Sequence, residues 1–285
     1  MDYLEGQSLS KYARSIPRER LERILRNYLG KPTENSDKKI VVESRKELIG
    51  MFCNYKSVES LDEIPNIRNI DVSKIISLNG VFNYMDNLKD ISALSSWDVS
   101  NVWFFENMFQ DCHQLESLHG LEKWNFKNAV SVKGMFRGCF KLCNIEAVRN
   151  WDLSNVINFD MMFDGCKPKD ISPITHWDVS NGRSFEEMLY GTSHEVIAKT
   201  KSLNIPNGLI LKDMFEGNVK RMTEELKWNV PKGIVFDDST ETEYQIIKNK
   251  LHEIINERVL KKLFEKYEPD TEELSNAYWD LFDEY

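Results

Sequence analysis

The chain has 285 residues, of which 41% are hydrophobic and 29% charged, and its formal net charge is −9. This composition is typical of a folded protein with one large core or two smaller ones, and no segment approaches the roughly 18 consecutive apolar residues of a membrane-spanning helix. The acidic balance argues against a nucleic-acid-binding protein, which would carry a basic stripe.

The first residues carry no export signal. Asp2 and Glu5 stand where a basic segment followed by an apolar one would be required. The five cysteines are an odd number and do not form the dense paired set of small secreted domains. We therefore expect an intracellular, cytoplasmic protein.

Residues 17–29 predict an amphipathic helix. It begins at Pro17 and is followed by Gly30, and its apolar face is formed by Leu21, Ile24, Leu25, Tyr28 and Leu29. We interpret residues 1–45 as an N-terminal helical cap that covers the first unit of the repeats that follow. An alternative interpretation is a degenerate F-box-like segment that docks a ligase adaptor.

An internal repeat of 26 or 27 residues dominates residues 46–238. Three markers keep the same interval and are expected to form ladders inside the protein: phenylalanines Phe82, Phe109, Phe136, Phe163 and Phe215, tryptophans Trp97, Trp124, Trp151 and Trp177, and cysteines Cys112, Cys139 and Cys166. Because no such unit can bury its apolar face alone, we expect the units to stack as coils.

Within one unit the apolar spacing predicts two elements. From Val102 to Cys112 the spacing of three, three, one and three predicts a short helix with one buried stripe. The spacing of three through Leu115, Leu118 and Leu121 predicts a brief extended segment. Between units, the segment from Trp97 to Val102 recurs at Trp151 and Trp177, and its Asp, Ser and Asn residues predict a corner that caps the next helix.

The corner W-D-x-S-N-V followed by M-F-x-x-C resembles the BspA-like leucine-rich repeats of mycoplasma-type surface lipoproteins, other bacterial surface proteins, some protists and large DNA viruses. The resemblance covers residues 46–233 and is strongest between Ile70 and Gly191. It implies an α/β repeat, a right-handed leucine-rich-repeat-like solenoid of about seven coils with a short strand and a short helix each, and a role in adhesion or protein binding. The family brings no catalytic residues, and the missing export signal makes this chain more similar to the viral members.

Residues 239–285 predict an acidic helical flank. A long helix is expected over residues 241–267, and Asp270 with Glu273 resembles the capping box of a second helix. The aromatic residues Tyr278, Trp279, Phe282 and Tyr285 lie among acidic ones, so this tail could be a docking peptide for a basic partner. The alternative is that these aromatic side chains cap the last coil.

Residues with reactive side chains have a structural interpretation too. We expect the cysteine ladder to pack as small apolar residues rather than to bind zinc. The corner aspartates Asp98, Asp152 and Asp178 are expected to form turns rather than an acid–base pair. The tryptophans are expected to be buried rather than to stack on sugars. We expect no catalytic residue, metal or cofactor.

The sequence therefore predicts a non-enzymatic protein–protein interaction or scaffolding module with protein partners and no nucleic acid. The alternative is a structural component of a large assembly, such as a minor capsid or cementing protein of a viral particle, in which case the protein would be found in the virion.

Overall fold

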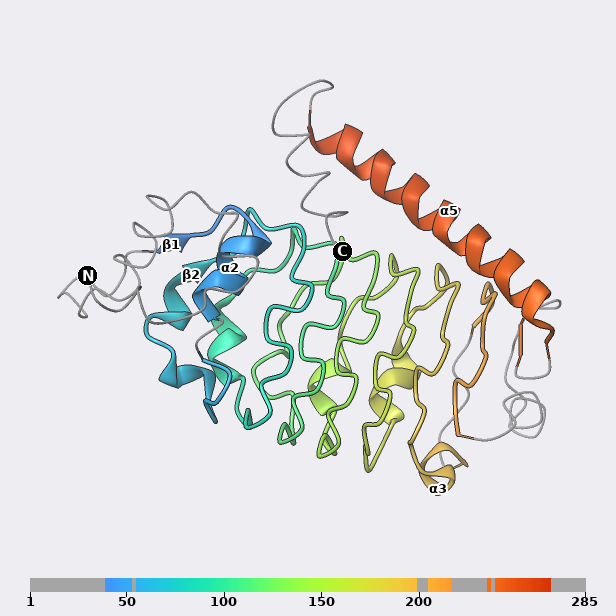
Figure 1. Cartoon of the computed structure of the whole chain (residues 1–285), viewed down its shortest axis with the longest axis horizontal. Coiled ribbons are helices and arrows are strands. Elements are labelled where there is room, and N and C mark those ends of the chain that lie inside the picture. Colours follow the sequence, from blue (N-terminus) through green and yellow to red (C-terminus); the bar gives the residue numbers. More distant parts are fainter. Residues whose placement is uncertain (1–38, 53–54, 199–204, 217–234, 237–238, 268–285) are drawn as a thin grey trace.

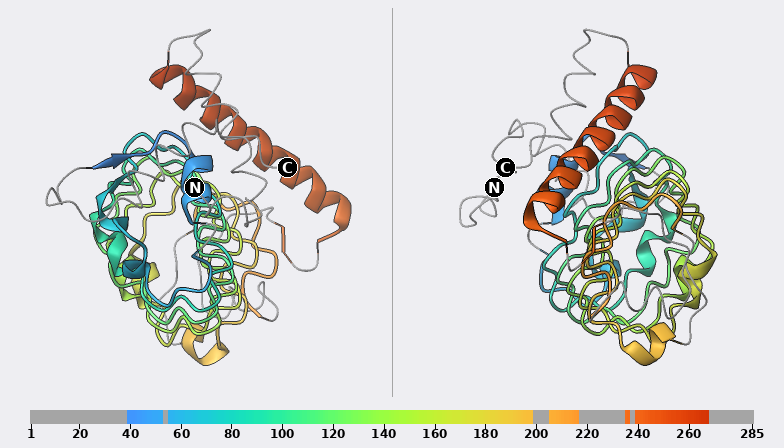
Figure 2. Two further views of the ribbon diagram at one scale, coloured as in Figure 1. Left: turned by 60° about the vertical axis from the view of Figure 1, so that its left-hand side comes forward. Right: turned by 90° about the vertical axis from the view of Figure 1, so that its right-hand side faces the viewer.

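The structure, a computed structural model, describes residues 39–52, 55–198, 205–216, 235–236 and 239–267. Within them the chain winds in successive coils that lie side by side along one axis, and a long helix crosses the outside of the coils (Figure 1). When the molecule is viewed from nearer one end of that axis or the other, the coils overlie one another around a common interior (Figure 2). The helix predicted over residues 17–29, the F-box-like segment and the aromatic tail from Tyr278 to Tyr285 lie outside the described residues.

Parallel bridges join each coil to the next at equivalent points. One series runs through Ser77, Phe104, Ser131, Asn158, Ser184, Ile210 and Val235, at intervals of 25 to 27 residues. At a second point of the coil, Ser60 pairs with Asp90 and Ser117 pairs with Asn144. Each coil thus supplies backbone partners for its neighbours, as stacked repeat units do.

The first described coils are closed by three elements. Strand β1 (Ile40–Val41) pairs in parallel with β2 (Ile70–Asp71), with Ile40 opposite Ile70. Helix α2 (Arg45–Phe52) follows β1 and buries Phe52, whose ring stacks on that of Phe82 at 4.9 Å between centroids. α2 therefore covers the interior at this end of the stack.

Other short elements occur on the way around the coils. In the described part of the chain, 3₁₀ helices occur at Leu61–Glu63, Ile67–Asn69, Ser92–Ser96, Glu146–Val148 and Ser172–His176. Helix α3 (His194–Ala198) is a single turn at the outer end of its coil (Figure 1).

The prediction of a short helix from Val102 to Cys112 is wrong, because these residues form turns and one bridge. The N–H groups of alternate residues donate to the next coil, Phe105 to the Ser131 carbonyl at 3.0 Å and Asn107 to the Lys133 carbonyl at 2.8 Å. An α-helix would need the same donors for bonds to the fourth preceding residue. The stacked coils therefore replace helical hydrogen bonds by bonds between neighbours.

The apolar spacing of three has its own cause in this arrangement. Successive apolar residues are joined by backbone bonds across three residues: Met108 N–H donates to the Phe105 carbonyl at 3.3 Å, Cys112 to Phe109 at 3.2 Å, and Leu115 to Cys112 at 3.1 Å. Each of these turns brings one apolar side chain to the inside, and successive apolar residues are therefore three positions apart. A chain of tight turns and a helix therefore give the same spacing in the sequence.

The coils repeat two backbone positions with positive φ. Asn107 (φ 54°) and Asp111 (φ 58°) occupy them in one coil, and Gly134 (φ 59°) and Gly138 (φ 73°) in the next. Residues there direct their N–H groups at the following coil, as Asn107 and Asp111 do. Glycine and asparagine tolerate this left-handed conformation best, which explains their presence in the turns.

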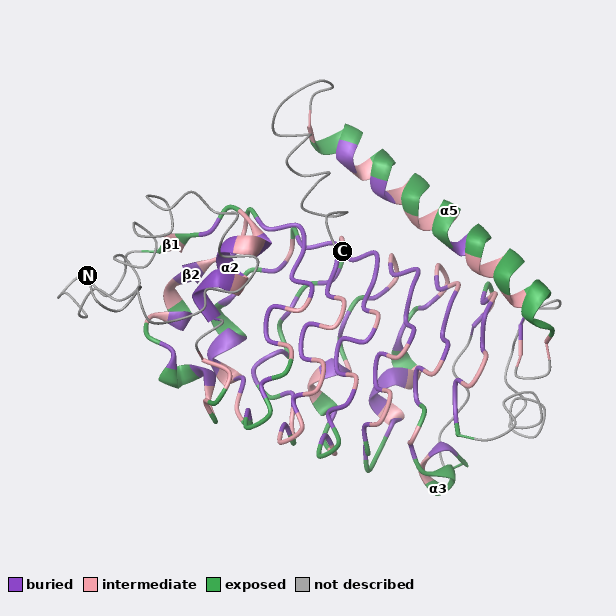
Figure 3. Cartoon of the chain, in the orientation of Figure 1, coloured by how far each residue is buried: buried purple, intermediate pink, exposed green. Residues whose placement is uncertain are grey.

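Buried residues occur in coil after coil along the stack (Figure 3), and the phenylalanine ladder is among them. Phe82, Phe109, Phe136 and Phe163 stack in sequence with centroids 5.5, 5.6 and 5.6 Å apart and planes within 14° of parallel. Phe215 is also fully buried, in a coil beyond Leu189. Such pairs contribute about 0.5–1.5 kcal/mol each beyond the burial of their area.

The tryptophan ladder lines another part of the interior. Trp97, Trp124, Trp151 and Trp177 are 3 to 5% exposed, and each indole N–H donates to a carbonyl of the preceding coil at 2.8 to 3.0 Å. A buried indole needs such a partner for its N–H. These rings are therefore not an exposed platform for sugars.

The corner residues bond within and between coils. Asp98 accepts a hydrogen bond from the N–H of Ser100 at 3.0 Å, and the bonds from Ser100 lower the pKa of Asp98. Asn101 donates to the Ser73 carbonyl of the preceding coil at 2.7 Å, and its equivalents Asn128, Asn155, Asn181 and Asn207 make the same bond at 2.7 to 2.8 Å. The corner aspartates thus form turns, and the asparagines tie coils together.

Helix α5 (Glu241–Lys266) lies across the outside of the coils (Figures 1 and 2). It begins with a capping box in which Thr240 and Glu243 bond each other's backbone N–H. Of its apolar residues, Leu251, Val259 and Leu263 are buried, and the side chains of Tyr244, Ile247, Ile254 and Ile255 are partly buried against the coils. Among the described residues, no helix is both long and apolar enough to pass through a bilayer.

Candidate functional site

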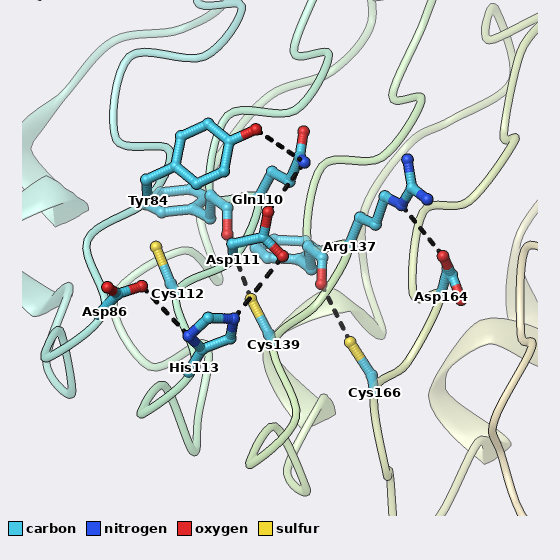
Figure 4. Close-up of polar contacts among 12 residues, drawn as sticks. Tyr84, Asp86, Gln110, Asp111, Cys112, His113, Arg137, Cys139, Asp164 and Cys166 are labelled. Carbon is cyan, nitrogen blue, oxygen red and sulfur yellow. Dashed lines mark hydrogen bonds and ion pairs between the residues drawn. The ribbon is translucent and has the colours of Figure 1, made fainter.

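The best candidate site is one edge of the stack, where the turns after the phenylalanine column meet the solvent. We call it the turn edge. Its aromatic members are Tyr84, Phe140 and Tyr190, which are 55, 52 and 41% exposed. Its polar members are Asp86, Gln110, Asp111, His113, Arg137 and Asp164 (Figure 4).

His113 links three coils of the turn edge. Its Nδ1 lies 3.1 Å from a carboxylate oxygen of Asp86, in the preceding coil, and its Nε2 lies 3.7 Å from that of Asp111 (Figure 4). Its ring stacks on Phe140 of the following coil, with centroids 5.0 Å apart and planes 3° from parallel. The exposed Phe140 ring is thus held in one orientation.

Two glycines make room for these side chains. A Cβ atom at Gly138 would lie 2.1 Å from a carboxylate oxygen of Asp111, and one at Gly165 would lie 3.0 Å from the Phe140 ring. Both glycines have positive φ, 73° and 75°. The local sequence therefore supplies both the turn and the space that Asp111 and Phe140 occupy.

The remaining polar members are paired with each other. Gln110 donates to Asp111 at 2.9 Å and to the Tyr84 hydroxyl at 3.4 Å. Arg137 donates through Nε to Asp164 at 3.1 Å. Burial raises the pKa of Asp164, and the charge of Arg137 offsets only part of that rise.

The cysteine ladder lies directly behind the turn edge and faces inward. Cys112, Cys139 and Cys166 are fully buried, and each thiol donates to the carbonyl of a core phenylalanine at 3.1 to 3.3 Å. Figure 4 draws this bond for Cys139 and Cys166. Burial raises the pKa of Cys112 to about 12, and it also raises the pKa of Cys139 and of Cys166. These thiols therefore stay protonated at neutral pH, whereas the thiolate is the nucleophilic form of cysteine.

No group of three His, Cys, Asp or Glu side chains with the arrangement of metal ligands occurs in the described part of the chain. Tyr278, Trp279, Phe282 and Tyr285, which the sequence offered as a possible docking segment, lie beyond it.

The repeat pattern of the sequence did not predict the turn edge. Its aromatic residues interrupt the repeat instead of forming it: at the position of Phe140, the neighbouring coils carry Asp86, His113 and Lys167. An aromatic residue next to the core pattern but outside it was the available signal. Regular spacing within the chain indicates the frame, whereas exposed apolar residues that break this spacing indicate a contact surface.

A family model described as "Mycoplasma protein of unknown function, DUF285" matches residues 46–169 and again residues 138–246. The two matches together span more than two thirds of the chain. The protein belongs to this family. The matched residues of this DUF285 protein include the phenylalanine, tryptophan and cysteine ladders, the turn edge and the first residues of α5. No curated protein and no solved structure gives a match.

Proposed function

We propose that this DUF285 protein is a non-enzymatic interaction module, a right-handed solenoid of BspA-like leucine-rich-repeat type whose turn edge binds a protein partner. One observation carries the proposal. Frame positions keep the same residue types from coil to coil, whereas one position of the turn edge holds Asn83, Gln110, Arg137, Asp164 and Tyr190 in successive coils. A constant frame that presents varied side chains is how repeat proteins build binding surfaces.

The chemistry of the turn edge suits protein recognition. Exposed Tyr84 and Phe140 offer large apolar contacts, and Phe140 is already oriented by His113, so little side-chain freedom is lost on binding. Aromatic anchors of this kind account for much of the affinity of protein interfaces. Carboxylates beside them, such as the exposed Asp86, add charge selectivity.

The test is site-specific photo-crosslinking in an extract of the source organism. A photoreactive phenylalanine at position 140 is expected to yield a discrete protein adduct, and Tyr84→Ala is expected to remove that adduct. The matched control carries the photoreactive group at position 264, because Phe264 has a similar exposure (58%) but lies on α5, away from the turn edge.

The outcomes differ clearly. Truncation of a central aromatic anchor costs about 2 kcal/mol of binding free energy, which is roughly a 30-fold loss of affinity. Equal adducts from positions 140 and 264, or an adduct that survives Tyr84→Ala unchanged, would contradict the proposal. Adducts only with subunits of a large particle would favour the alternative, a structural component of an assembly.

A further inference from the structure

Helix α5 packs on a second surface, separate from the turn edge, which we call the bridge face. It consists of coil residues at or next to the first series of bridges: Ile76, Trp103, Phe104, Val130, Ile157, Leu209, Ile210 and Val235. Together with α5 they form an apolar cluster of their own. The cluster inside the coils contains no residue of α5. The interior packing of the coils is therefore complete without the helix.

The contact between α5 and the bridge face follows one side of the helix. Of its 26 residues, Leu251, Val259 and Leu263 are buried, and the apolar residues packed beside them are only partly buried. At the C-terminal end, the amino groups of Lys262 and Lys266 lie 5.5 and 5.7 Å from the centre of the Trp103 ring. Burial lowers the pKa of both lysines. A helix held along one stripe can separate from its support without opening the core.

The bridge face also holds a buried acidic socket, formed by Asp160 and Glu186 from neighbouring coils. Their side chains are 2 and 8% exposed. The coils position Asp160 by themselves: the Ser184 hydroxyl donates to it, and the Glu186 N–H donates to it at 3.0 Å. The socket therefore belongs to the coils and not to the helix.

α5 fills this socket with a cation. The Lys248 amino group donates to Glu186 at 2.5 Å and lies 3.8 Å from Asp160, while the Tyr244 hydroxyl donates to Glu186 at 2.7 Å. Burial alone would lower the pKa of Lys248, but the two carboxylates and Tyr244 outweigh it and raise the pKa. Two buried carboxylates demand such a partner, because an unpaired buried charge is costly.

We propose that the bridge face is a helix-docking surface for a protein partner and that α5 occupies it in cis. The partner is an amphipathic helix that places a lysine in the Asp160–Glu186 socket and an apolar stripe on Trp103, Val130 and Ile157. α5 itself shows which chemistry the surface accepts. Since a tethered helix competes at a high effective concentration, the partner gains access only when α5 is displaced. This surface and its ligand are independent of the function proposed for the turn edge.

The test supplies α5 in trans to the full-length chain. The probe is a fluorescently labelled peptide of residues 239–267, and binding is measured by anisotropy. The wild-type chain is compared with Lys248→Ala/Leu251→Asp, which removes the cation and one buried contact of the tethered helix. We expect the double variant to bind the peptide at least tenfold more tightly than the wild type does.

Three controls test the specificity. Ile246→Asp changes the outward face of α5, where Ile246 is 61% exposed, so this variant should bind the peptide as weakly as the wild type. A peptide with Lys248→Glu should lose at least tenfold in affinity for the double variant, because it brings a third carboxylate to the socket. Phe140→Ala in the double variant should leave peptide binding unchanged, which separates this surface from the turn edge.

Three results would overturn the proposal. In the first, the double variant keeps the cooperative melting of the coils but binds the peptide no better than the wild type. In the second, the Lys248→Glu peptide binds as well as the native peptide. In the third, the double variant loses the cooperative melting of the coils, which would make α5 a required part of the fold instead of a displaceable ligand.

Discussion

Phe136→Ala tests the packing on which the whole stack depends. The Phe136 ring is fully buried between Phe109 and Phe163, with both centroid distances 5.6 Å, and Trp151 lies 6.4 Å away. Loss of a buried phenylalanine costs about 3–5 kcal/mol through lost burial and the cavity that remains. The upper part of that range is expected, because bonds such as that from Phe136 N–H to the Met162 carbonyl fix the spacing of the coils, so the coils cannot close over the cavity.

The measurement is thermal unfolding followed by calorimetry or circular dichroism. In a protein of this size 1 kcal/mol corresponds to about 2–4 °C, so a cost of about 4–5 kcal/mol should lower the melting temperature by about 8–20 °C. Phe140→Ala is the matched control in the same coil: its ring is 52% exposed, so the cost should stay below about 1 kcal/mol. If the two variants melted within about 2 °C of each other, the reasoning from the buried column would be refuted.

Three further predictions concern the turns, the corners and the thiols. Gly120→Ala should lower the free energy of unfolding by more than about 1 kcal/mol, because the φ of Gly120 is +102° and the added Cβ would lie 2.6 Å from the Ser92 Cα. Urea unfolding measures this loss, and an unchanged midpoint would contradict the close approach. Bonds from Ser100 lower the pKa of Asp98, so its contribution to stability is present above the unfolded pKa of about 3.9 and is lost as the pH falls through the folded pKa; Asp98→Asn should make unfolding less pH-dependent in that window, and an unaltered slope would count against it. Burial raises the pKa of Cys139, so mass spectrometry should find this thiol unalkylated by iodoacetamide at about pH 8 until the protein is denatured, and modification of the native protein would show that the thiol is accessible.

The sequence predicted which side chains share a row but not the local backbone. Phe109, Phe136 and Phe163 recur at one interval, so their place in a common column follows from periodicity. The prediction of a helix from Val102 to Cys112 was wrong, because a helix and a series of tight turns closed by bonds to the third preceding residue give the same apolar spacing. Only the hydrogen-bond partners in the next coil distinguish the two, and single-unit reasoning does not include them.

The candidate site was less predictable than the frame. Tyr84 and Phe140 lie outside the repeating pattern, and their proximity to Asp111 and His113 depends on the register between coils. The aromatic tail residues, which the sequence offered either as a docking peptide or as a cap of the last coil, lie outside the described residues, so their role stays a prediction.

Sequence alone determined the period, the buried rows and the long amphipathic helix over residues 241–267, because each is a local pattern of apolar residues. Tertiary structure decided where that helix lies and what its lysine contacts: Lys248 meets Asp160 and Glu186, 88 and 62 residues away in the chain. It also decided that the alternate N–H groups of each coil bond to a neighbour instead of forming a helix. The physical reason is that a backbone donor can bond inside its own unit or to the next one, and stacking makes the second choice available to every coil at once.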